Sequence, residues 1–410
     1  MSSPGTPTLS PFRSWLGVAV ITASLFTFVT TELMPVGLLT PLSSSLKVAV
    51  GTAGLIVTLF GISAGLGVPF LVAWTRHVNR RALLPILLAV MALGNLVIAV
   101  SPSFTLVLLT RLVMGFAHGM FWAIAVGMAM RLVPERHAGR AAAIALSGIS
   151  IGTVAGIPLG TLIGGLTSWR TTFLLWSALS VLAVLATIPS LPSENAASVR
   201  EVFALPVRNA QLRAVMFTVI LYVLGHFGAY TFIRPFLEKT DSASSGFITG
   251  LLIIYGIGGA VGNFLAGHMA GKNPRVNFML ACGGLAVSLL LLLTIGHSPA
   301  GAIVSMALWG VSFGAANLCQ INLTLGAAPD TFEAAMSINT LGYNLSIALG
   351  ALFGGLLTDN LGVRSALWFG VALTAASLLL TIALGRKAGK RGDTSVANQA
   401  ADHVDAVAEA

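Results

Sequence analysis

Charged side chains are scarce in this sequence. Asp, Glu, Lys and Arg make up 9% of its 410 residues, whereas soluble proteins carry about 25%. Hydrophobic residues make up 56%, and the mean hydropathy is +0.91. A soluble globular fold of this length would need more charge to cover its surface, so we expect an all-α polytopic membrane protein that lies in a lipid bilayer.

Cysteines and reactive clusters are scarce as well. The two cysteines, Cys282 and Cys319, lie in apolar runs, which argues against a disulfide framework. We find neither a metal-ligand spacing nor a nucleophile with a nearby base, so we expect no cofactor, no metal and no enzymatic activity. The net charge of +9 comes from short loops. We attribute it to membrane topology and expect no nucleic-acid partner.

Twelve apolar runs, in two groups of six, are long enough to be membrane-spanning helices. We expect a cytoplasmic N-terminal tail at 1–14, a six-helix bundle at 15–190, a cytoplasmic linker at 191–211, a second bundle at 212–386 and a disordered cytoplasmic tail at 387–410. The runs lie at 15–40, 52–73, 82–100, 105–131, 139–165, 170–190, 212–236, 246–270, 275–296, 299–326, 331–358 and 364–386. No small-residue cleavage site follows the first run, so we expect an uncleaved helix.

The basic residues predict the orientation. If both termini are cytoplasmic, sixteen Lys and Arg residues lie on that side and five lie outside, with Arg111 inside the membrane. This bias favours cytoplasmic termini. The five outside residues are Lys47, Arg170, Arg234, Lys239 and Arg364.

Polar and small residues recur with a period of three runs. The first, fourth, seventh and tenth runs carry polar side chains, and the second, fifth, eighth and eleventh carry glycine stripes that allow close packing. We therefore expect the four striped helices to pack against one another. A period of three in twelve helices is typical of nested three-helix repeats in two pseudo-symmetric bundles, with a substrate site between them. The turns at Trp169-Arg170 and Val363-Arg364 repeat the same pattern weakly.

Glu32 and Arg111 are the clear ionic residues within the apolar runs. An acid at membrane depth is costly, so it is a functional-site hypothesis by default. Counted from the basic ends of their runs, both lie about 30 Å into the membrane at about 1.5 Å per residue. We expect them to pair directly or through water and to couple transport to protons. In the alternative, Glu32 only packs against a neighbouring helix and Arg111 only ties backbone carbonyls together.

A substrate pocket is expected on the polar runs, where aromatic faces would contact ring carbons and polar groups would bind hydroxyls. Each histidine could instead be a neutral hydrogen-bonding group, and each amide could merely bridge helices. The expected substrate-binding residues are His118, Trp122, His226, Tyr230, Gln320 and Asn344.

Three motifs resemble those of the major facilitator superfamily. Arg111-Leu-Val-Met-Gly115 resembles the fourth-helix motif of proton-driven exporters. Gly152-Thr-Val-Ala-Gly156-Ile-Pro158-Leu-Gly160, followed by Trp169-Arg170, resembles the fifth-helix exporter motif, which implies a conformational role for these glycines and the proline. Arg80 and Arg81 match the basic pair between the second and third helices. There, however, Arg76 and Asn79 replace the usual acid and glycine, which puts a charge relay through that loop in doubt.

Further stretches resemble the bacterial sugar efflux transporters of the SotB type. They are Thr-Thr-Glu32-Leu-Met-Pro-Val-Gly, Phe-Ala-His118-Gly-Met-Phe-Trp122, His226-Phe-Gly-Ala-Tyr230 and Ala-Pro329-Asp330. The resemblance implies a proton-coupled exporter of arabinose-like sugars and thiogalactosides in the bacterial inner membrane. We expect the protein to be a monomer. A drug or nucleoside antiporter of the same fold, and a transporter-like sensor or passive facilitator, remain alternatives.

Overall fold

The computed structural model describes residues 11–74, 80–187, 209–239, 244–269, 273–328 and 331–384. Within these ranges the chain is helical and contains no strand. Eleven of the described helices are long and apolar enough to span a membrane, and a bent pair, Leu39–Leu46 with Val50–Leu66, would make twelve. The expectation of an all-α polytopic membrane protein is confirmed.

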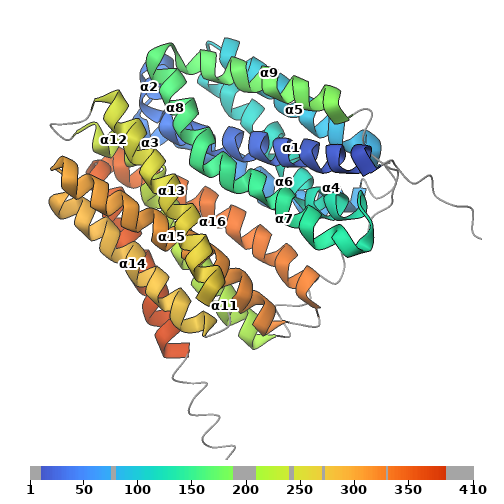
Figure 1. The fold of residues 1–410 in the computed structure, drawn as a ribbon. Helices are drawn as coiled ribbons and strands as arrows, with labels where there is room; N and C mark the ends of the chain where they lie inside the picture. Colours follow the sequence, from blue (N-terminus) through green and yellow to red (C-terminus); the bar gives the residue numbers. More distant parts are fainter. Residues whose placement is uncertain are drawn as a thin grey trace, which may run out of the picture.

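The helices form two bundles (Figure 1). The N-terminal bundle comprises α1 (Pro11–Gly37), α2 (Leu39–Leu46), α3 (Val50–Ala53), α4 (Leu55–Trp74), α5 (Arg80–Val100), α6 (Phe104–Arg131), η2 (Glu135–His137), α7 (Ala138–Ile151), η3 (Gly152–Gly156), α8 (Ile157–Leu166) and α9 (Trp169–Thr187).

The C-terminal bundle comprises α11 (Ala210–Tyr230), α12 (Ile233–Leu237), α13 (Ser245–Met269), α14 (Pro274–Ile295), α15 (Pro299–Ala327), α16 (Phe332–Leu361) and a last helix, Val363–Leu384. Nearly all of the expected linker and both expected tails lie outside the described residues, so those segments remain predictions.

Two of the expected spans are interrupted. The first run leaves α1 at Gly37 and continues as α2, after which the chain bends by 110° into α3 and α4. The fifth run contains a π-helical turn, η3, between α7 and α8. Pro158 follows this turn and has no N–H to donate to the carbonyl of Val154, which a regular α-helix would require. The π turn accommodates this missing bond, and such turns are frequent at functional sites.

The expectation that the striped helices pack against one another is confirmed for two pairs of helices. Gly61 and Gly65 of α4 lie against Asn344 of α16, and Gly256 of α13 lies against Val154 of η3. The stripe on α7, η3 and α8 packs against α1, where Gly156 faces Thr30 and Gly160 faces Met34. Most of the stripe glycines also bring a polar central helix close within their own bundle.

The C-terminal bundle repeats this arrangement. A stripe on α16 packs against α11, with Gly350 against Leu224 and Gly354 against Gly228. The stripe on α13 packs against α15, where Gly262 meets the backbone of Val311. Gly156 and Gly350 are separated by the same interval as Gly160 and Gly354, which agrees with a pseudo-symmetric pair of bundles.

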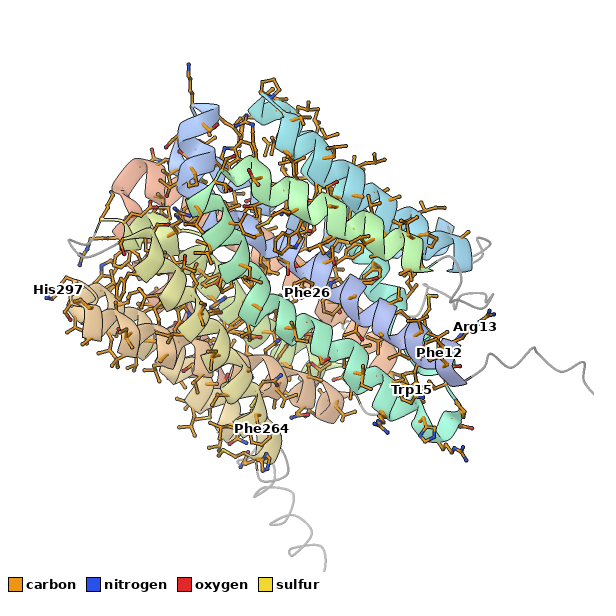
Figure 2. The ribbon with its side chains drawn as sticks, turned by 45° about the horizontal axis from the view of Figure 1, so that its top comes forward. Phe12, Arg13, Trp15, Phe26, Phe264 and His297 are labelled. Carbon is orange, nitrogen blue, oxygen red and sulfur yellow. The ribbon has the colours of Figure 1, made fainter. Side chains whose placement is uncertain are left out.

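The bundles are joined at one end, which we call the distal end and which carries α2, α3 and α12. There Arg234 of α12 donates to the carbonyl of Gly37 and to Glu238 (2.7 Å), and Thr40 donates to Glu238 (2.5 Å). Asp359, at the end of α16, accepts hydrogen bonds from α3. The opposite, proximal end is where α1 begins and the last helix ends. Figure 2 shows Phe12 and Arg13 at the proximal end, far from His297 at the distal end.

Burial along the two central helices changes from one end to the other. In α1, Leu16 is 41% exposed and Ala19 and Ala23 are exposed, whereas residues 27–39 are buried apart from the half-buried Leu33. In α11, Phe217 is 57% exposed, whereas every residue from 225 to 237 is buried. The central helices are therefore enclosed on all sides near the distal end only. The ribbons of the two bundles converge at that end and spread apart away from it (Figure 1).

Candidate functional site

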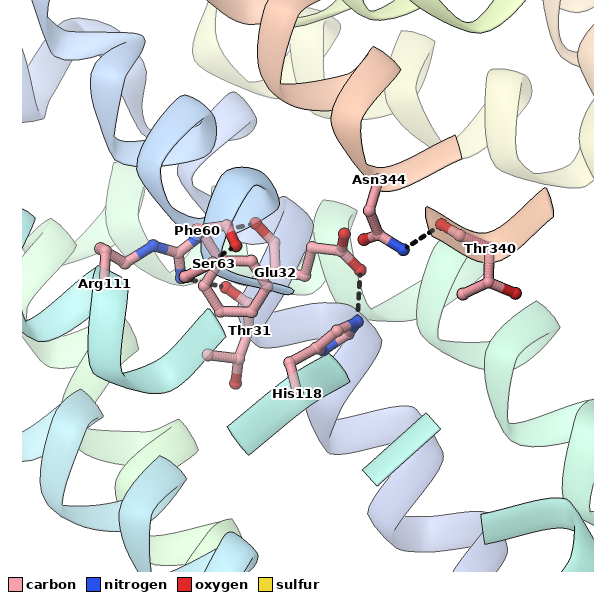
Figure 3. A network of polar contacts seen from close by, with 8 residues as sticks. All are labelled: Thr31, Glu32, Phe60, Ser63, Arg111, His118, Thr340 and Asn344. Atoms are coloured by element: carbon pink, nitrogen blue, oxygen red, sulfur yellow. Dashed lines mark hydrogen bonds and ion pairs between the residues drawn. The ribbon is translucent and has the colours of Figure 1, made fainter. Parts of the chain in front are cut away.

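A buried carboxyl–imidazole pair lies between α1 and α6. Glu32 of α1 lies 3.3 Å from Nε2 of His118 on α6, and both residues are at least nine-tenths buried (Figure 3). Phe28 and Phe60 pack against the imidazole, with ring centroids 5.8 and 5.0 Å away. A carboxyl and an imidazole at this distance can share a proton, and the surrounding rings keep water from competing for it.

The His118 imidazole has a second nitrogen, Nδ1, that is buried without a hydrogen-bond partner. A buried polar atom that is left unpaired costs free energy, so this nitrogen is a place where a water or a ligand hydroxyl would be stabilised. Trp122 lies one helical turn further along α6, with its ring centroid 6.0 Å from the imidazole. The structure thus brings His118 and Trp122 together beside Glu32, as a common site requires.

We expected Arg111 and Glu32 to pair directly or through water, and the structure shows no direct contact between the guanidinium and the carboxylate. The guanidinium donates to three backbone carbonyls instead, from Nε to Ile56 (3.1 Å), from Nη1 to Thr31 (2.9 Å) and from Nη2 to Glu32 (2.9 Å). It also lies 4.1 Å over the ring of Phe60. The fully buried guanidinium therefore ties α1 and α4 to α6, and the Glu32 side chain turns toward His118 (Figure 3).

A proline explains why a carbonyl of α1 is available to Arg111. Within a helix, the carbonyl of Thr31 would accept from the N–H of residue 35, but residue 35 is proline and has none. Without another donor this carbonyl would be unpaired inside the membrane, where an unpaired backbone group costs several kcal/mol of free energy. Arg111 supplies the missing donor. Pro35 and Arg111 thus fix the part of α1 that carries Glu32.

Asn344 of α16 faces the Glu32 carboxyl from the other bundle (Figure 3). Its amide donates to the carbonyl of Thr340 (2.9 Å), and its backbone lies against Gly61 of α4. The Glu32–His118 pair therefore sits at the contact between the two bundles, and relative movement of the bundles would change its surroundings.

His226 and Tyr230 belong to a second group inside the C-terminal bundle. The His226 Nδ1 accepts from the indole of Trp309 (3.0 Å), and its Nε2 lies 3.2 Å from the Tyr255 hydroxyl. Phe313 stacks on the imidazole at 3.7 Å. His226 is fully buried and Tyr230 is 2% exposed, so neither is open to a ligand in this conformation.

Gln320 stands apart from both groups. Its amide donates to Asn317 (3.2 Å), while its Oε1 is buried without a partner. The six expected substrate residues therefore fall into three groups: His118, Trp122 and Asn344 around Glu32; His226 and Tyr230 in the aromatic cluster; and Gln320. Sequence reasoning missed Tyr255, Trp309, Phe313 and Tyr343. All four tyrosines of the chain lie in the second bundle, which was a usable signal.

The residues assigned to conformational motifs lie at two places. Gly152 and Gly156 are buried in the π turn, and Pro158 and Gly160 follow in α8. The turn also touches the other bundle, because Gly256 of α13 packs against Val154. Arg80 and Arg81 open α5, but their side chains, like Arg76 and Asn79, lie outside what the structure describes.

Comparison with known proteins identifies the family. A family model described as Major Facilitator Superfamily matches residues 16–332. The chain belongs to the major facilitator superfamily. It is thus a multi-pass membrane protein of a transporter family, and the sugar efflux subgroup remains a prediction.

Solved structures show the same fold for this superfamily member. A bacterial homologue of the human lysosomal transporter Spinster, inward-facing and occupied, is 14% identical with a TM-score of 0.75 over 92% of this chain and 98% of that one. Its inward-facing, unoccupied structure is 15% identical with a TM-score of 0.69, covering 91% and 95%. The human organic anion transporter MFSD10 is 16% identical with a TM-score of 0.67, covering 91% and 100%.

Proposed function

We propose that this protein is a proton-coupled exporter of small sugars or similar small amphiphiles that works by alternating access. The observation that carries the proposal is the buried Glu32–His118 pair, 3.3 Å apart at the contact between the two bundles. A passive pore has no need of a buried acid at membrane depth. Arg111 is occupied by backbone carbonyls, so the carboxyl is left to exchange its proton with the imidazole.

In the proposed cycle the substrate leaves the cytoplasm while a proton enters. A proton arriving from outside neutralises Glu32, and its release to the cytoplasm restores the charge. The charge state of Glu32 would bias the two bundles because Asn344 of the opposite bundle faces it. The substrate would lie beside His118 and Trp122, where the unpaired Nδ1 offers a hydrogen bond and the indole offers an apolar face.

We place the proximal end in the cytoplasm of a bacterium, with the protein in the inner membrane. The sixteen-to-five distribution of basic residues supports this orientation. The contacts of Arg234 and Asp359 at the distal end are then those of a state closed to the outside. Labelling an introduced cysteine in the 191–211 segment tests the orientation, and labelling from outside intact cells would overturn it.

The decisive experiment is uphill transport in proteoliposomes under an imposed pH gradient, with arabinose and a thiogalactoside as first substrates. Glu32→Gln carries no exchangeable proton at this position, so it should lose uphill transport yet retain downhill exchange of substrate. Glu135→Gln, which removes an exposed acid, is the matched control and should transport like the parent. Uphill transport by Glu32→Gln in response to the gradient would refute proton coupling at this site.

A second candidate is an exporter of amphiphilic drugs. The aromatic cluster favours it, because His226 is surrounded by Tyr230, Tyr255, Trp309 and Phe313, which would offer stacking surfaces if the bundle opened. Including aromatic cations and nucleosides in the substrate panel separates the two candidates. Transport of these compounds without transport of either sugar would favour the second one.

A further inference from the structure

A pocket of about 370 Å³ opens at the distal end of the C-terminal bundle, away from the Glu32 site. It lies between α12, the end of α14 and the start of the last helix. Phe236, Lys239, Leu292, Leu293, Thr294, His297, Val363 and Arg364 line it.

The lining combines basic groups with an apolar floor. Lys239, His297 and Arg364 are exposed, whereas Phe236 and Val363 are buried. None of the residues that line the pocket is acidic. Three groups that carry or can carry positive charge around one opening are suited to an anion with several oxygen acceptors.

Arg364 is fixed at the rim of this pocket. Its Nη2 donates to the carbonyl of Leu293 at 2.9 Å, which holds the guanidinium in place by one of its N–H groups. A guanidinium has five such donors, so the group retains capacity for phosphate or carboxylate oxygens.

The equivalent arginine of the N-terminal bundle, Arg170, makes different contacts. Arg170 follows Trp169 at the start of α9 as Arg364 follows Val363 at the start of the last helix. Its guanidinium donates to Ser45 (3.0 Å) and to the carbonyl of Ser101 (2.9 Å) and lies 4.2 Å over the Trp169 ring. In the C-terminal bundle valine replaces this tryptophan, and the space beside the arginine contributes to the pocket.

The exposed residues around the pocket suit a position at the level of the lipid head groups. Trp368, one helical turn after Arg364, is 52% exposed, and tryptophan is enriched at membrane–water interfaces. Ile295, at the end of α14, is 40% exposed, as expected for a lipid-facing helix. Only five Lys and Arg residues were expected at this end of the protein, and two of them line this one pocket together with a histidine.

We propose that this pocket binds the phosphate group of an anionic lipid from the leaflet at the distal end. Lys239, His297 and Arg364 would contact the phosphate, and Phe236 and Val363 would contact the glycerol and the first methylene groups. Inorganic phosphate offers the same oxygens, but it would leave the apolar floor without a partner. The proposal is independent of the transported substrate and of proton coupling.

Native mass spectrometry of the purified full-length protein tests this proposal by titration with phosphatidylglycerol or phosphatidylcholine. The parent should retain phosphatidylglycerol preferentially. Lys239→Gln should weaken this binding about fivefold, and Lys239→Gln combined with Arg364→Gln should weaken it more than tenfold, because each basic residue near the membrane surface contributes to anionic lipid binding. Each variant is first checked for a monodisperse elution profile, and Lys239→Gln alone suffices if the double variant aggregates.

Lys47→Asn is the matched control. Lys47 is a basic residue at the same end in the other bundle, with a φ of 54°, a backbone conformation that asparagine tolerates. It should bind phosphatidylglycerol like the parent. Equal retention of the two lipids, or an equal loss in Lys47→Asn, would overturn the proposal. Saturable binding of radiolabelled inorganic phosphate without a preference for phosphatidylglycerol would overturn the lipid as the occupant.

Discussion

Asp359 of α16 caps α3 of the opposite bundle through Thr52. Its carboxylate accepts from the backbone N–H of Thr52 at 2.9 Å, from the Thr52 hydroxyl at 3.0 Å and from the N–H of Gly51 at 2.6 Å. Gly51 also lies against the backbone of Gly355, where a Cβ would collide, so this approach requires glycine. One carboxylate therefore joins the distal ends of the bundles by charge-assisted bonds that can be broken and remade.

Replacing Asp359 should loosen the distal closure. Asp359→Ala removes all three bonds, and we expect the fraction of molecules open at the distal end to rise about tenfold, since bonds to a charged group are among the stronger ones. Val36, fully buried near this end, reports the opening if it is changed to cysteine after Cys282 and Cys319 have been replaced by serine. The measurement is its rate of alkylation by a membrane-impermeant maleimide.

The neighbouring Asn360 provides the control for this measurement. Its side chain donates to the carbonyl of Leu356 within its own helix. Asn360→Ala should leave the alkylation rate of the reporter cysteine unchanged. If Asp359→Ala also leaves the rate unchanged, the Asp359 contacts do not hold the distal end closed.

Arg111→Lys should destabilise the protein although it keeps the charge. Lysine is a point donor and cannot reach the carbonyls of Thr31, Glu32 and Ile56 together, so about two bonds are lost, at a cost of about 3 kcal/mol. The free energy of unfolding in mixed detergent micelles measures this. Stability equal to that of the parent would show that the three carbonyls do not need the guanidinium.

Pro35→Ala tests why Thr31 depends on Arg111. Alanine restores an N–H at residue 35 that can bond the Thr31 carbonyl, so Arg111→Lys should cost about 1 kcal/mol less in this background than in the parent. The double-mutant cycle uses the same unfolding measurement. Strict additivity of the two changes would contradict the link between Pro35 and Arg111.

Gly156→Ala should disturb the contact between the π turn and α1. A Cβ at residue 156 would collide with the side chain of Thr30, which is buried. We expect a loss of about 2 kcal/mol in stability, partly recovered by Thr30→Ala, which removes the colliding hydroxyl and methyl groups. Gly127→Ala, at a position with nothing within 4 Å of the added carbon, is the control and should be neutral. A neutral Gly156→Ala would contradict close packing at this turn.

The fold was predictable from the sequence because the length of the apolar runs reports directly on membrane-spanning helices. Partners of individual side chains were not predictable in the same way. Glu32 and Arg111 were correctly singled out as buried, yet depth alone could not show that Arg111 reaches carbonyls and that Glu32 reaches His118. The spacing of Pro35 from Thr31 did contain that information, since it leaves one carbonyl needing a donor.

The last prediction separates two histidine-containing groups that the sequence could not distinguish. His226→Ala should mainly destabilise the protein, because it leaves the Trp309 indole and the Tyr255 hydroxyl without their buried partner, at about 1–3 kcal/mol each. Trp122→Ala should leave stability nearly unchanged, because Trp122 is only half-buried, and should weaken binding of a transported substrate about tenfold. Thermal unfolding and equilibrium binding of the same preparations measure both quantities. Normal substrate binding by Trp122→Ala, or normal stability of His226→Ala, would show that the division between a ligand-binding group around Glu32 and a structural aromatic cluster is wrong.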